Sequence, residues 1–287
     1  MRIGRRLEGA LLSPLALLLV AALIVPAGIL LYYSFFDFVF FTRVGGATLD
    51  NYRSAFTNSA YRTFAANTLW IALPTTAVSV VAGYVLAYGI GFGRLRRRTL
   101  LFALLLTALM ASYLVRIYAW RTLLGESGIV NSALTGAGII DKPLGFLLFS
   151  RIAVIIAESS LFIPFAALAL FAALSGISPE YREVSRDLGA GRLQTLWRVT
   201  IPLSGRALLA VTAVVFFLSC ADYITPSLVG GASSQTIGVV IASYFGEAAQ
   251  YGLGAALSFL TLVAFALAYA GLRIAMRTTR ILAPNVV

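Results

Sequence analysis

The chain has 287 residues, of which 60% are hydrophobic and only 11% are charged, and its mean hydropathy is +0.91. A soluble domain carries about 25% charged residues to keep its surface in water, so this composition excludes a soluble globular enzyme, a disordered chain and a fibrous repeat. The net charge of +11 fits arginine-rich cytoplasmic loops better than nucleic-acid binding, and we expect an all-α polytopic membrane protein, folded as a single transmembrane domain over residues 1–287.

Six apolar stretches are long enough to cross a bilayer as helices, which takes about 20 residues. They cover residues 11–36, 68–91, 100–115, 152–174, 203–221 and 253–272, and the third can continue through Tyr118 and Trp120. The first stretch follows a basic N-terminal segment, as a cleaved signal peptide also would. Its uncharged run is longer than the roughly 7–15 residues of a signal peptide, which favours an uncleaved anchor helix.

The basic residues alternate between the segments that join these stretches. Arginines gather before the first stretch, at 94–98, at 182–198 and at 273–280, whereas residues 222–252 contain neither lysine nor arginine. Basic loops stay on the cytoplasmic side of a membrane. This pattern therefore predicts that both termini lie in the cytoplasm.

The cytoplasmic segment 178–202, called the elbow below, has the pattern of a helix-turn-helix. Ser178 suits an N-cap and Pro179 suits the first helical position, and acidic residues follow where the helix dipole favours them. Gly189 and Gly191 then break the helix, and a second short helix runs to Pro202. The elbow is either a connecting loop with one face on the bilayer or a rigid docking element for a soluble partner, and its caps and its double-glycine break favour docking.

The last outer loop, residues 222–250, contains an apolar run at 237–245. It is either a flexible external loop or a short helix that dips into the membrane or lies on it. Apolar residues of this kind avoid water, which favours the re-entrant or surface-lying helix.

The elbow carries a family resemblance. Its run Glu183-Val-Ser-Arg-Asp-Leu-Gly189, followed by Ile-Pro-Leu at 201–203, resembles the EAA motif of binding-protein-dependent ABC importer permeases, although Val184 and Ser185 replace the two alanines of the motif. The resemblance implies a type I permease fold in which the elbow is the coupling helix that docks on the ATPase subunit. The residues that it implies for ATPase coupling are Glu183, Asp187, Leu188, Gly189, Ala190 and Gly191.

Further blocks extend the resemblance over most of the chain. Residues 48–52, 112–120, 125–131 and 222–231 are similar to the spermidine/putrescine permease group. This implies a polyamine such as putrescine or spermidine as the cargo, while other relatives of the group carry opines, phosphonates, amino acids or iron. It also implies a bacterial inner membrane location, a second homologous permease, an ATPase dimer that binds ATP and Mg, and a periplasmic binding protein.

Three charged residues fall in or near apolar stretches, where they are expensive and face an interior or a water-filled path. These are Glu158, Arg116 and Asp222. In one interpretation, Glu158 and Asp222 contact a cationic solute, helped by the aromatic rings of Tyr113, Tyr118, Trp120 and Tyr223. In the other, Arg116 pairs with one of the carboxylates as a structural element, and for an anionic solute Arg116 itself becomes the candidate ligand.

Three residue types limit the chemistry of the chain. It has no histidine, and Cys220 is its single cysteine, which argues against a metal centre and against an intramembrane enzyme of the serine–histidine type. Its single lysine, Lys142, lies between Asp141 and Pro143, whereas a Walker A loop needs Gly-Lys-Ser/Thr. We therefore expect no cofactor on this chain and ATP hydrolysis on a partner. A secondary transporter is the remote alternative, because no internal repeat is apparent and the elbow would then be unexplained.

Overall fold

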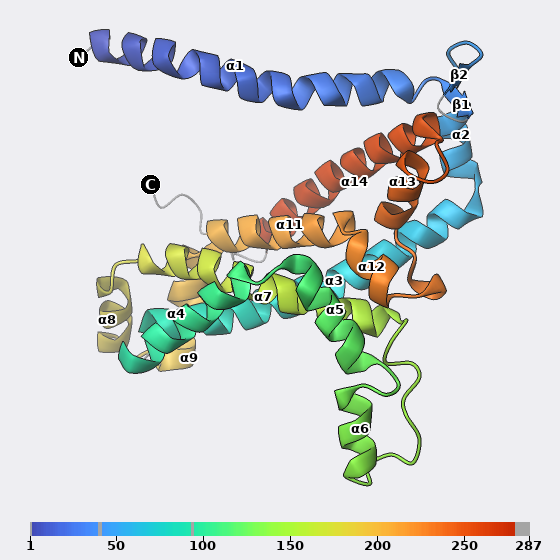
Figure 1. Ribbon diagram of the computed structural model, residues 1–287. Helices are drawn as coiled ribbons and strands as arrows, with labels where there is room; N and C mark the ends of the chain where they lie inside the picture. The colour runs from blue at the N-terminus through green and yellow to red at the C-terminus, as the bar shows by residue number, and fades with distance from the viewer. Residues whose placement is uncertain (1, 40–41, 93–94, 279–287) are drawn as a thin grey trace. The chain divides into compact units, whose positions relative to one another are not determined.

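The computed structural model (Figure 1) describes residues 2–39, 42–92 and 95–278. The chain forms two compact units. The first unit comprises Met1–Arg62 with Val240–Val263, and the second comprises Thr63–Val239 with Ala264–Val287. Arg94 and Arg280, which contribute to the predicted orientation, lie outside the described residues.

The first unit begins with α1 (Arg2–Tyr33), which ends three residues before the predicted limit of its apolar stretch. A short antiparallel pair follows, β1 (Asp37–Val39) and β2 (Thr42–Val44), and then α2 (Asp50–Thr57). The buried Asn51 amide donates hydrogen bonds to the backbone oxygens of Ser34 (3.2 Å) and Phe36 (3.1 Å). Asn51 therefore satisfies carbonyl groups that the end of α1 leaves without a helical partner.

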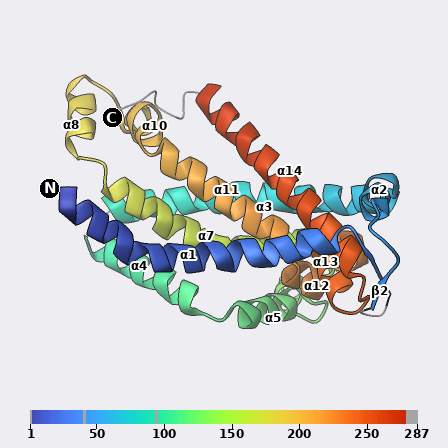
Figure 2. The ribbon, with the colours of Figure 1, turned by 90° about the horizontal axis from the view of Figure 1, so that it is seen from above.

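The second unit is built around three long apolar helices, α3 (Ser59–Phe92), α7 (Arg151–Ser175) and α11 (Gly205–Ala221). They run side by side (Figure 2) and share a hydrophobic core that includes Val80, Leu170 and Val215. The approach of α3 to α7 is close at Gly83, because a Cβ atom there would lie 2.7 Å from the Cβ of Ala166. Small residues at a contact let membrane helices pack closely without a hydrophobic driving force.

Three described helices are each long and apolar enough to cross a membrane: α3, α7 and the Tyr251–Ala275 part of α14 (Tyr251–Thr278). They match the predicted second, fourth and sixth stretches. The apolar part of α1 that the structure describes, Leu17–Tyr33, is shorter. The helical content and these apolar helices confirm the predicted all-α membrane fold class.

The third apolar stretch does not form the continuous helix that we predict. The chain forms α4 (Leu95–Met110) and α5 (Tyr113–Leu124), and the helical segments on the two sides of the break make an angle of 97°. Ser112 has extended backbone angles (φ −56°, ψ 135°), and the helix does not continue through it to Tyr118 and Trp120. Hydrophobicity alone cannot reveal such a break, because the residues on both sides are equally apolar. Beyond α5, the short α6 (Ile129–Gly136) follows.

The predicted fifth stretch begins two residues too early. The elbow comprises α8 (Glu180–Asp187), α9 (Arg192–Thr195), the π-helix η1 (Leu196–Thr200) and α10 (Ile201–Leu203), and α11 starts at Gly205. The Arg192–Leu203 segment and α11 make an angle of 73°. Residues 222–250 form α12 (Ile224–Val229), the 3₁₀-helix η2 (Ala232–Ser234) and α13 (Ile237–Phe245), so the apolar run at 237–245 is helical.

We predict that Gly83→Val destabilises the second unit by about 1–3 kcal/mol, because the added side chain overpacks the contact between α3 and α7. Gly91→Val is the matched control on the same helix, since a Cβ atom at Gly91 meets no atom within 4 Å. Thermal unfolding of the purified protein in detergent measures both variants. Equal melting temperatures for the two would contradict the close contact.

Candidate functional site

Glu158 lies in the first third of α7 and is fully buried. The Ser219 hydroxyl of α11 donates a hydrogen bond to Glu158 Oε2, whereas Oε1 has no partner. The fully buried Thr75 side chain of α3 lies beside this carboxyl group and interacts with it. A carboxyl group that is buried with unused hydrogen-bonding capacity is costly, which makes Glu158 a candidate functional residue.

Buried hydroxyl groups without a hydrogen-bond partner also occur on α3 and α7. They belong to Thr76 and Ser79 of α3 and to Ser159 of α7. The interior of a native protein contains few buried polar groups without a hydrogen-bond partner, so this group of hydroxyls on α3 and α7 requires an explanation. Sequence reasoning missed these hydroxyls and Ser219, because single serines and threonines in apolar helices commonly bond their own backbone.

Asp222 has a local structural role. Its Oδ1 accepts hydrogen bonds from the backbone N–H groups of Ile224 (2.9 Å) and Thr225 (3.2 Å), and its Oδ2 accepts one from the Thr225 hydroxyl (2.5 Å). These contacts satisfy donors at the start of α12. The Tyr113 hydroxyl lies 3.0 Å from that of Thr225 and donates to it, because Thr225 uses its single proton on Asp222. The spacing Asp-x-x-Thr in the sequence could have predicted that the Thr225 hydroxyl binds Asp222.

Asp222 and Glu158 are near enough to each other to interact electrostatically. The structure thus brings together three of the predicted path residues, Glu158, Asp222 and Tyr113, from α7, α11–α12 and α5.

Arg116 forms no ion pair with either carboxylate in the part of the chain that the structure describes. Its Nη2 donates to the backbone oxygen of Ala111 (3.2 Å) at the break between α4 and α5, while Nε and Nη1 are buried without partners. The interpretation in which Arg116 pairs structurally with Glu158 or Asp222 is therefore wrong. The break exposes a carbonyl group that the arginine binds instead.

The other predicted aromatic residues lie in different surroundings. Trp120 Nε1 donates to the Ser160 hydroxyl of α7 (2.7 Å), which holds the indole ring against the core. Tyr118 and Tyr223 are each about half exposed. Of these aromatic side chains, Tyr113 alone joins the hydrogen-bonded group around Asp222.

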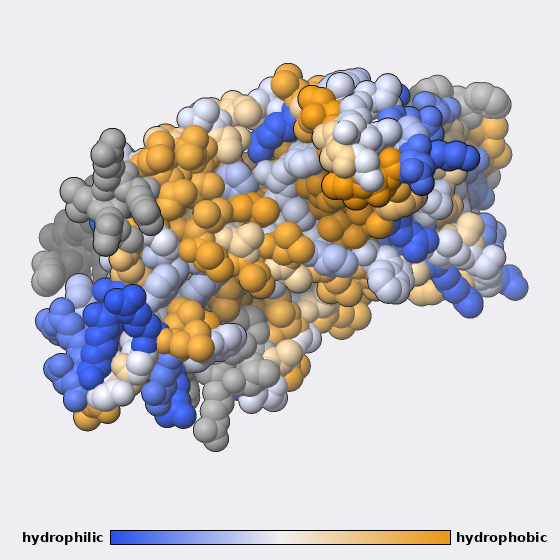
Figure 3. Space-filling view, turned by 90° about the horizontal axis from the view of Figure 1, so that it is seen from below, coloured by the Kyte–Doolittle hydropathy of each residue, from blue (hydrophilic) through white to orange (hydrophobic). Residues whose placement is uncertain are grey.

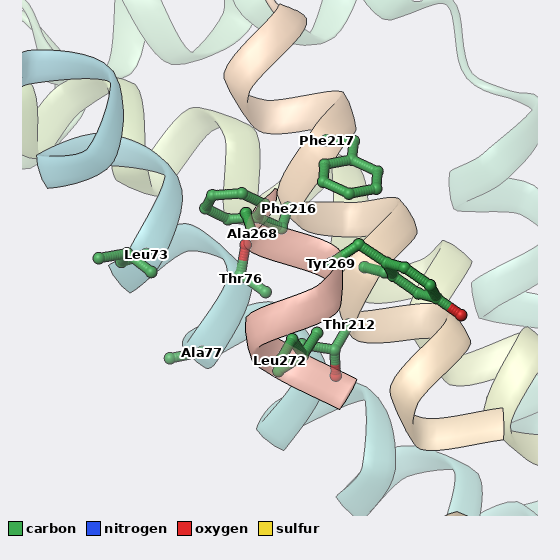
Figure 4. A pocket seen from close by; sticks show the side chains of 10 residues that line it. Leu73, Thr76, Ala77, Thr212, Phe216, Phe217, Ala268, Tyr269 and Leu272 are labelled. Carbon is green, nitrogen blue, oxygen red and sulfur yellow. The ribbon is translucent and has the colours of Figure 1, made fainter. Parts of the chain in front are cut away.

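A cavity of about 310 Å³ lies within the second unit, between α3, α11 and α14 (Figure 4). Apolar and aromatic side chains line most of it, and the threonines of α3 and α11 add two hydroxyl groups. The lining residues are Leu73, Thr76, Ala77, Thr212, Ala213, Phe216, Phe217, Ala268, Tyr269 and Leu272. Thr212, Phe216 and Ser219 share one face of α11 by their i, i+4, i+7 spacing, so this face leads from the cavity toward Glu158.

The turn of the elbow depends on Gly189. This residue has φ +82°, which only glycine adopts without strain. The N–H of Ala190 binds the oxygen of Ser185 (3.0 Å), and the N–H of Gly189 binds the oxygen of Arg186 (2.8 Å). These two bonds form a Schellman motif that ends α8. The helix α8 begins at Glu180, and its N-cap residue is Pro179, which makes no side-chain hydrogen bond. The cap therefore lies one residue beyond the predicted Ser178.

The elbow presents apolar side chains to its surroundings. Among them, Leu188 is 83% exposed, and Tyr181, Val184, Leu193 and Trp197 are each at least half exposed. Figure 3 shows the hydrophilic side chains of α8 and α9 beside a broad hydrophobic band. The guanidinium group of Arg182 lies 3.5 Å from the ring centre of Phe92, which attaches α8 to the end of α3. The elbow is thus a well-defined projection with an uncovered apolar face.

Residues 46–281 match the model of the family described as "binding-protein-dependent transport system inner membrane component". The chain belongs to this family. It is therefore a multi-pass inner-membrane ABC importer permease, a transporter component rather than an enzyme. The predicted family resemblance is confirmed.

The curated relatives of this permease include the spermidine/putrescine permease PotB. The chain is 31% identical to PotB of Haemophilus influenzae, covering 77% of this chain and 76% of that protein, and 32% identical to PotB of Escherichia coli K12, covering 75% and 78%. It is also 29% identical to GgtC, an osmoprotective-compound uptake permease of Synechocystis, with coverage of 88% and 92%.

Two solved structures share the fold of the permease. A bacterial ABC transporter for alginate import matches with a TM-score of 0.76 and 18% identity, covering 97% of this chain and 99% of that chain. The alginate transporter in complex with its periplasmic protein matches with a TM-score of 0.74 and 19% identity, covering 97% of both chains. At these identities the likeness supports the fold, and it confirms the type I permease architecture.

We predict that Asp222→Ala lowers the stability of the permease by about 0.5–2 kcal/mol, because it removes every acceptor at the start of α12. Asp222→Asn keeps the oxygen that the two N–H groups use and is expected to lose less. Thermal unfolding of both variants measures the difference. If the asparagine variant were the less stable of the two, the structural role of this side chain would be refuted.

Proposed function

We propose that this permease forms the translocation path for a polyamine such as putrescine or spermidine, which a periplasmic binding protein delivers. The observation that carries the proposal is the fully buried Glu158, whose Oε1 has no partner and whose neighbourhood contains unpartnered hydroxyls. A primary ammonium group supplies both a positive charge and three hydrogen-bond donors. It would supply the donor that Glu158 Oε1 lacks. The similarity to the two PotB permeases supports the same substrate class.

The predicted path residues then have different roles. Glu158 holds the ammonium group, and Asp222 adds a second negative charge while it maintains α12. Tyr113 orients Thr225 and Asp222. The aromatic cavity at the other end of the α11 face suits the alkyl chain, because Phe216 and Phe217 offer apolar surface and negative ring faces.

The elbow is the proposed coupling element. Its uncovered apolar face, with Leu188 at its tip, fits a groove on an ATPase subunit, and Glu183 and Asp187 are exposed beside it. ATP and Mg bind on that ATPase dimer, and a second permease completes the path. With the elbow on the cytoplasmic side, both termini are cytoplasmic. Closure of the ATPases moves the elbow and alternates the access of the path.

Arg116 favours a second candidate, an anionic solute. Two of its guanidinium nitrogens are buried without partners, so it too could hold a charged ligand. An amino acid or opine carries both charges and could use Arg116 and Glu158 together, whereas a phosphonate would need Arg116 alone. Iron and the operation of the chain as a secondary transporter are the more distant alternatives.

Glu158→Gln distinguishes these cargoes. In proteoliposomes that contain the complete importer, we expect this variant to reduce the uptake of labelled putrescine about ten- to a hundredfold, because a hydrogen bond to a charged group is lost. Glu126→Gln, which removes an exposed carboxylate, should leave uptake unchanged. Unchanged putrescine uptake in Glu158→Gln would contradict the role of Glu158. Uptake of a labelled amino acid or phosphonate that is lost in Arg116→Gln would favour the anionic solute.

Gly189→Val tests the coupling role. A side chain at φ +82° costs about 1–3 kcal/mol of backbone strain, so we expect the turn to open and putrescine import per ATP to fall, while membrane insertion is retained. Gly138→Val imposes comparable strain (φ +67°) beyond the end of α6 and serves as the control. Normal coupling in the Gly189 variant would disprove the docking role.

A further inference from the structure

A line of hydroxyl side chains, linked in part through the backbone oxygens that they bind, connects α8 of the elbow to the core helix α3. The line begins where the two arms of the elbow meet. The hydroxyl groups of Ser185 in α8 and Thr195 in α9 lie 3.1 Å apart, and Thr195 is buried. This contact joins the arms across the glycine turn, so that the elbow moves as one body.

The line continues through the π-helix. Thr200 is fully buried, and its hydroxyl donates to the backbone oxygen of Thr195 (3.4 Å). Ile201 N–H reaches back five residues to the oxygen of Leu196, and Pro202 has no N–H to offer. A π-helix is rare and less stable than an α-helix, and it occurs mostly at functional positions.

The line ends at Ser204, where the elbow and α11 meet at 73°. The Ser204 hydroxyl donates to the backbone oxygens of Thr200 (2.9 Å) and Ile201 (3.1 Å). The Tyr84 hydroxyl of α3 lies 3.0 Å from the Ser204 hydroxyl. A serine hydroxyl has a single proton, so Tyr84 is the donor in this contact. The Tyr84 ring itself packs against the core shared by α3, α7 and α11.

We propose that Tyr84 is a positioning residue for transport, which through Ser204 fixes the angle between the elbow and α11. This inference rests on the proposed docking of the elbow on an ATPase. With the angle fixed, a displacement of α8 turns α11 as a rigid body. Without the Tyr84 hydroxyl, the same displacement is absorbed at Ser204.

The fixed angle connects the docking face to the buried carboxyl group. From Gly205, α11 runs without interruption to Ala221 and carries Ser219, whose hydroxyl binds Glu158. The distance along the helix from Ser204 to Ser219 is about 22 Å at 1.5 Å per residue. A rotation at the hinge therefore moves the Ser219 donor relative to Glu158 of α7, and the elbow can control how strongly Glu158 is held.

Tyr84→Phe tests the proposal, because it removes one hydroxyl and keeps the packed ring. Tyr88→Phe is the matched control: Tyr88 lies one turn further along α3, is equally half-buried, and packs its ring on Phe92 (4.7 Å). The complete importer, with its partner permease, ATPase and binding protein, is reconstituted in proteoliposomes. ATP hydrolysis and the import of labelled putrescine are measured together, and co-purification of the ATPase reports on docking.

We expect Tyr84→Phe to raise the ATP hydrolysed per imported putrescine about two- to tenfold, as the loss of one neutral hydrogen bond implies. ATPase co-purification stays normal, and Tyr88→Phe behaves as the unmodified chain. Ser204→Ala has at least the same effect, because it removes the contact with Tyr84 together with the bonds to Thr200 and Ile201. The double variant Tyr84→Phe/Ser204→Ala is then no worse than Ser204→Ala alone, since the contact with Tyr84 is already lost.

Coupling in Tyr84→Phe equal to that in Tyr88→Phe would overturn the proposal, as would additive effects in the double variant or loss of ATPase co-purification. Gly189→Val separates this failure from that of the docking role. If Gly189→Val uncouples transport while Tyr84→Phe does not, the elbow docks but Tyr84 does not position it. If neither variant uncouples transport, the docking role fails as well.

Discussion

A polar group inside a lipid bilayer has to find its hydrogen-bond partner within the protein, and the structure of this permease follows from that constraint. It accounts for the long apolar helices α3, α7 and α14, whose backbone groups are satisfied internally. It also accounts for what happens where a helix breaks. Arg116 binds the free oxygen of Ala111 between α4 and α5, and Ser204 binds the oxygen of Thr200 before α11. At the first break a side chain thus supplies a donor, and at the second the Ser204 hydroxyl adds to the bond that its own N–H makes with the same oxygen.

The same constraint separates two carboxylates that look alike in the sequence. Asp222 uses both oxygens on the first residues of α12, so its charge is balanced by N–H and hydroxyl donors. Glu158 has one donor, Ser219, and one free oxygen in a fully buried position. A buried group of this kind is stable when a ligand or a proton supplies what the protein does not. These contacts are the reason why we propose the binding role for Glu158 and a mainly structural role for Asp222.

In the mechanism that we propose, the elbow and the core move together. The glycine turn at Gly189 gives α8 its position, the line of hydroxyls makes the elbow rigid, and Tyr84 holds the hinge at Ser204 against the core. The helix that leaves this hinge carries the donor to Glu158. A force applied to Leu188 at the exposed tip can thus reach the buried carboxyl group through a few directional contacts. Apolar packing alone would permit sliding, whereas these hydrogen bonds fix an angle.

The sequence by itself determined the membrane class, the apolar stretches, the glycine turn of the elbow and the helix at 237–245, because hydrophobic length and the φ freedom of glycine are local properties. Its motif also indicated the family that the comparison over residues 46–281 confirmed. Only the tertiary structure revealed the 97° break at Ser112, the unpaired Arg116 and the line of hydroxyls that ends at Tyr84. These features depend on which helices meet. A lone serine, threonine or arginine in an apolar stretch gives no sign of the partner that lies opposite it until the chain has folded.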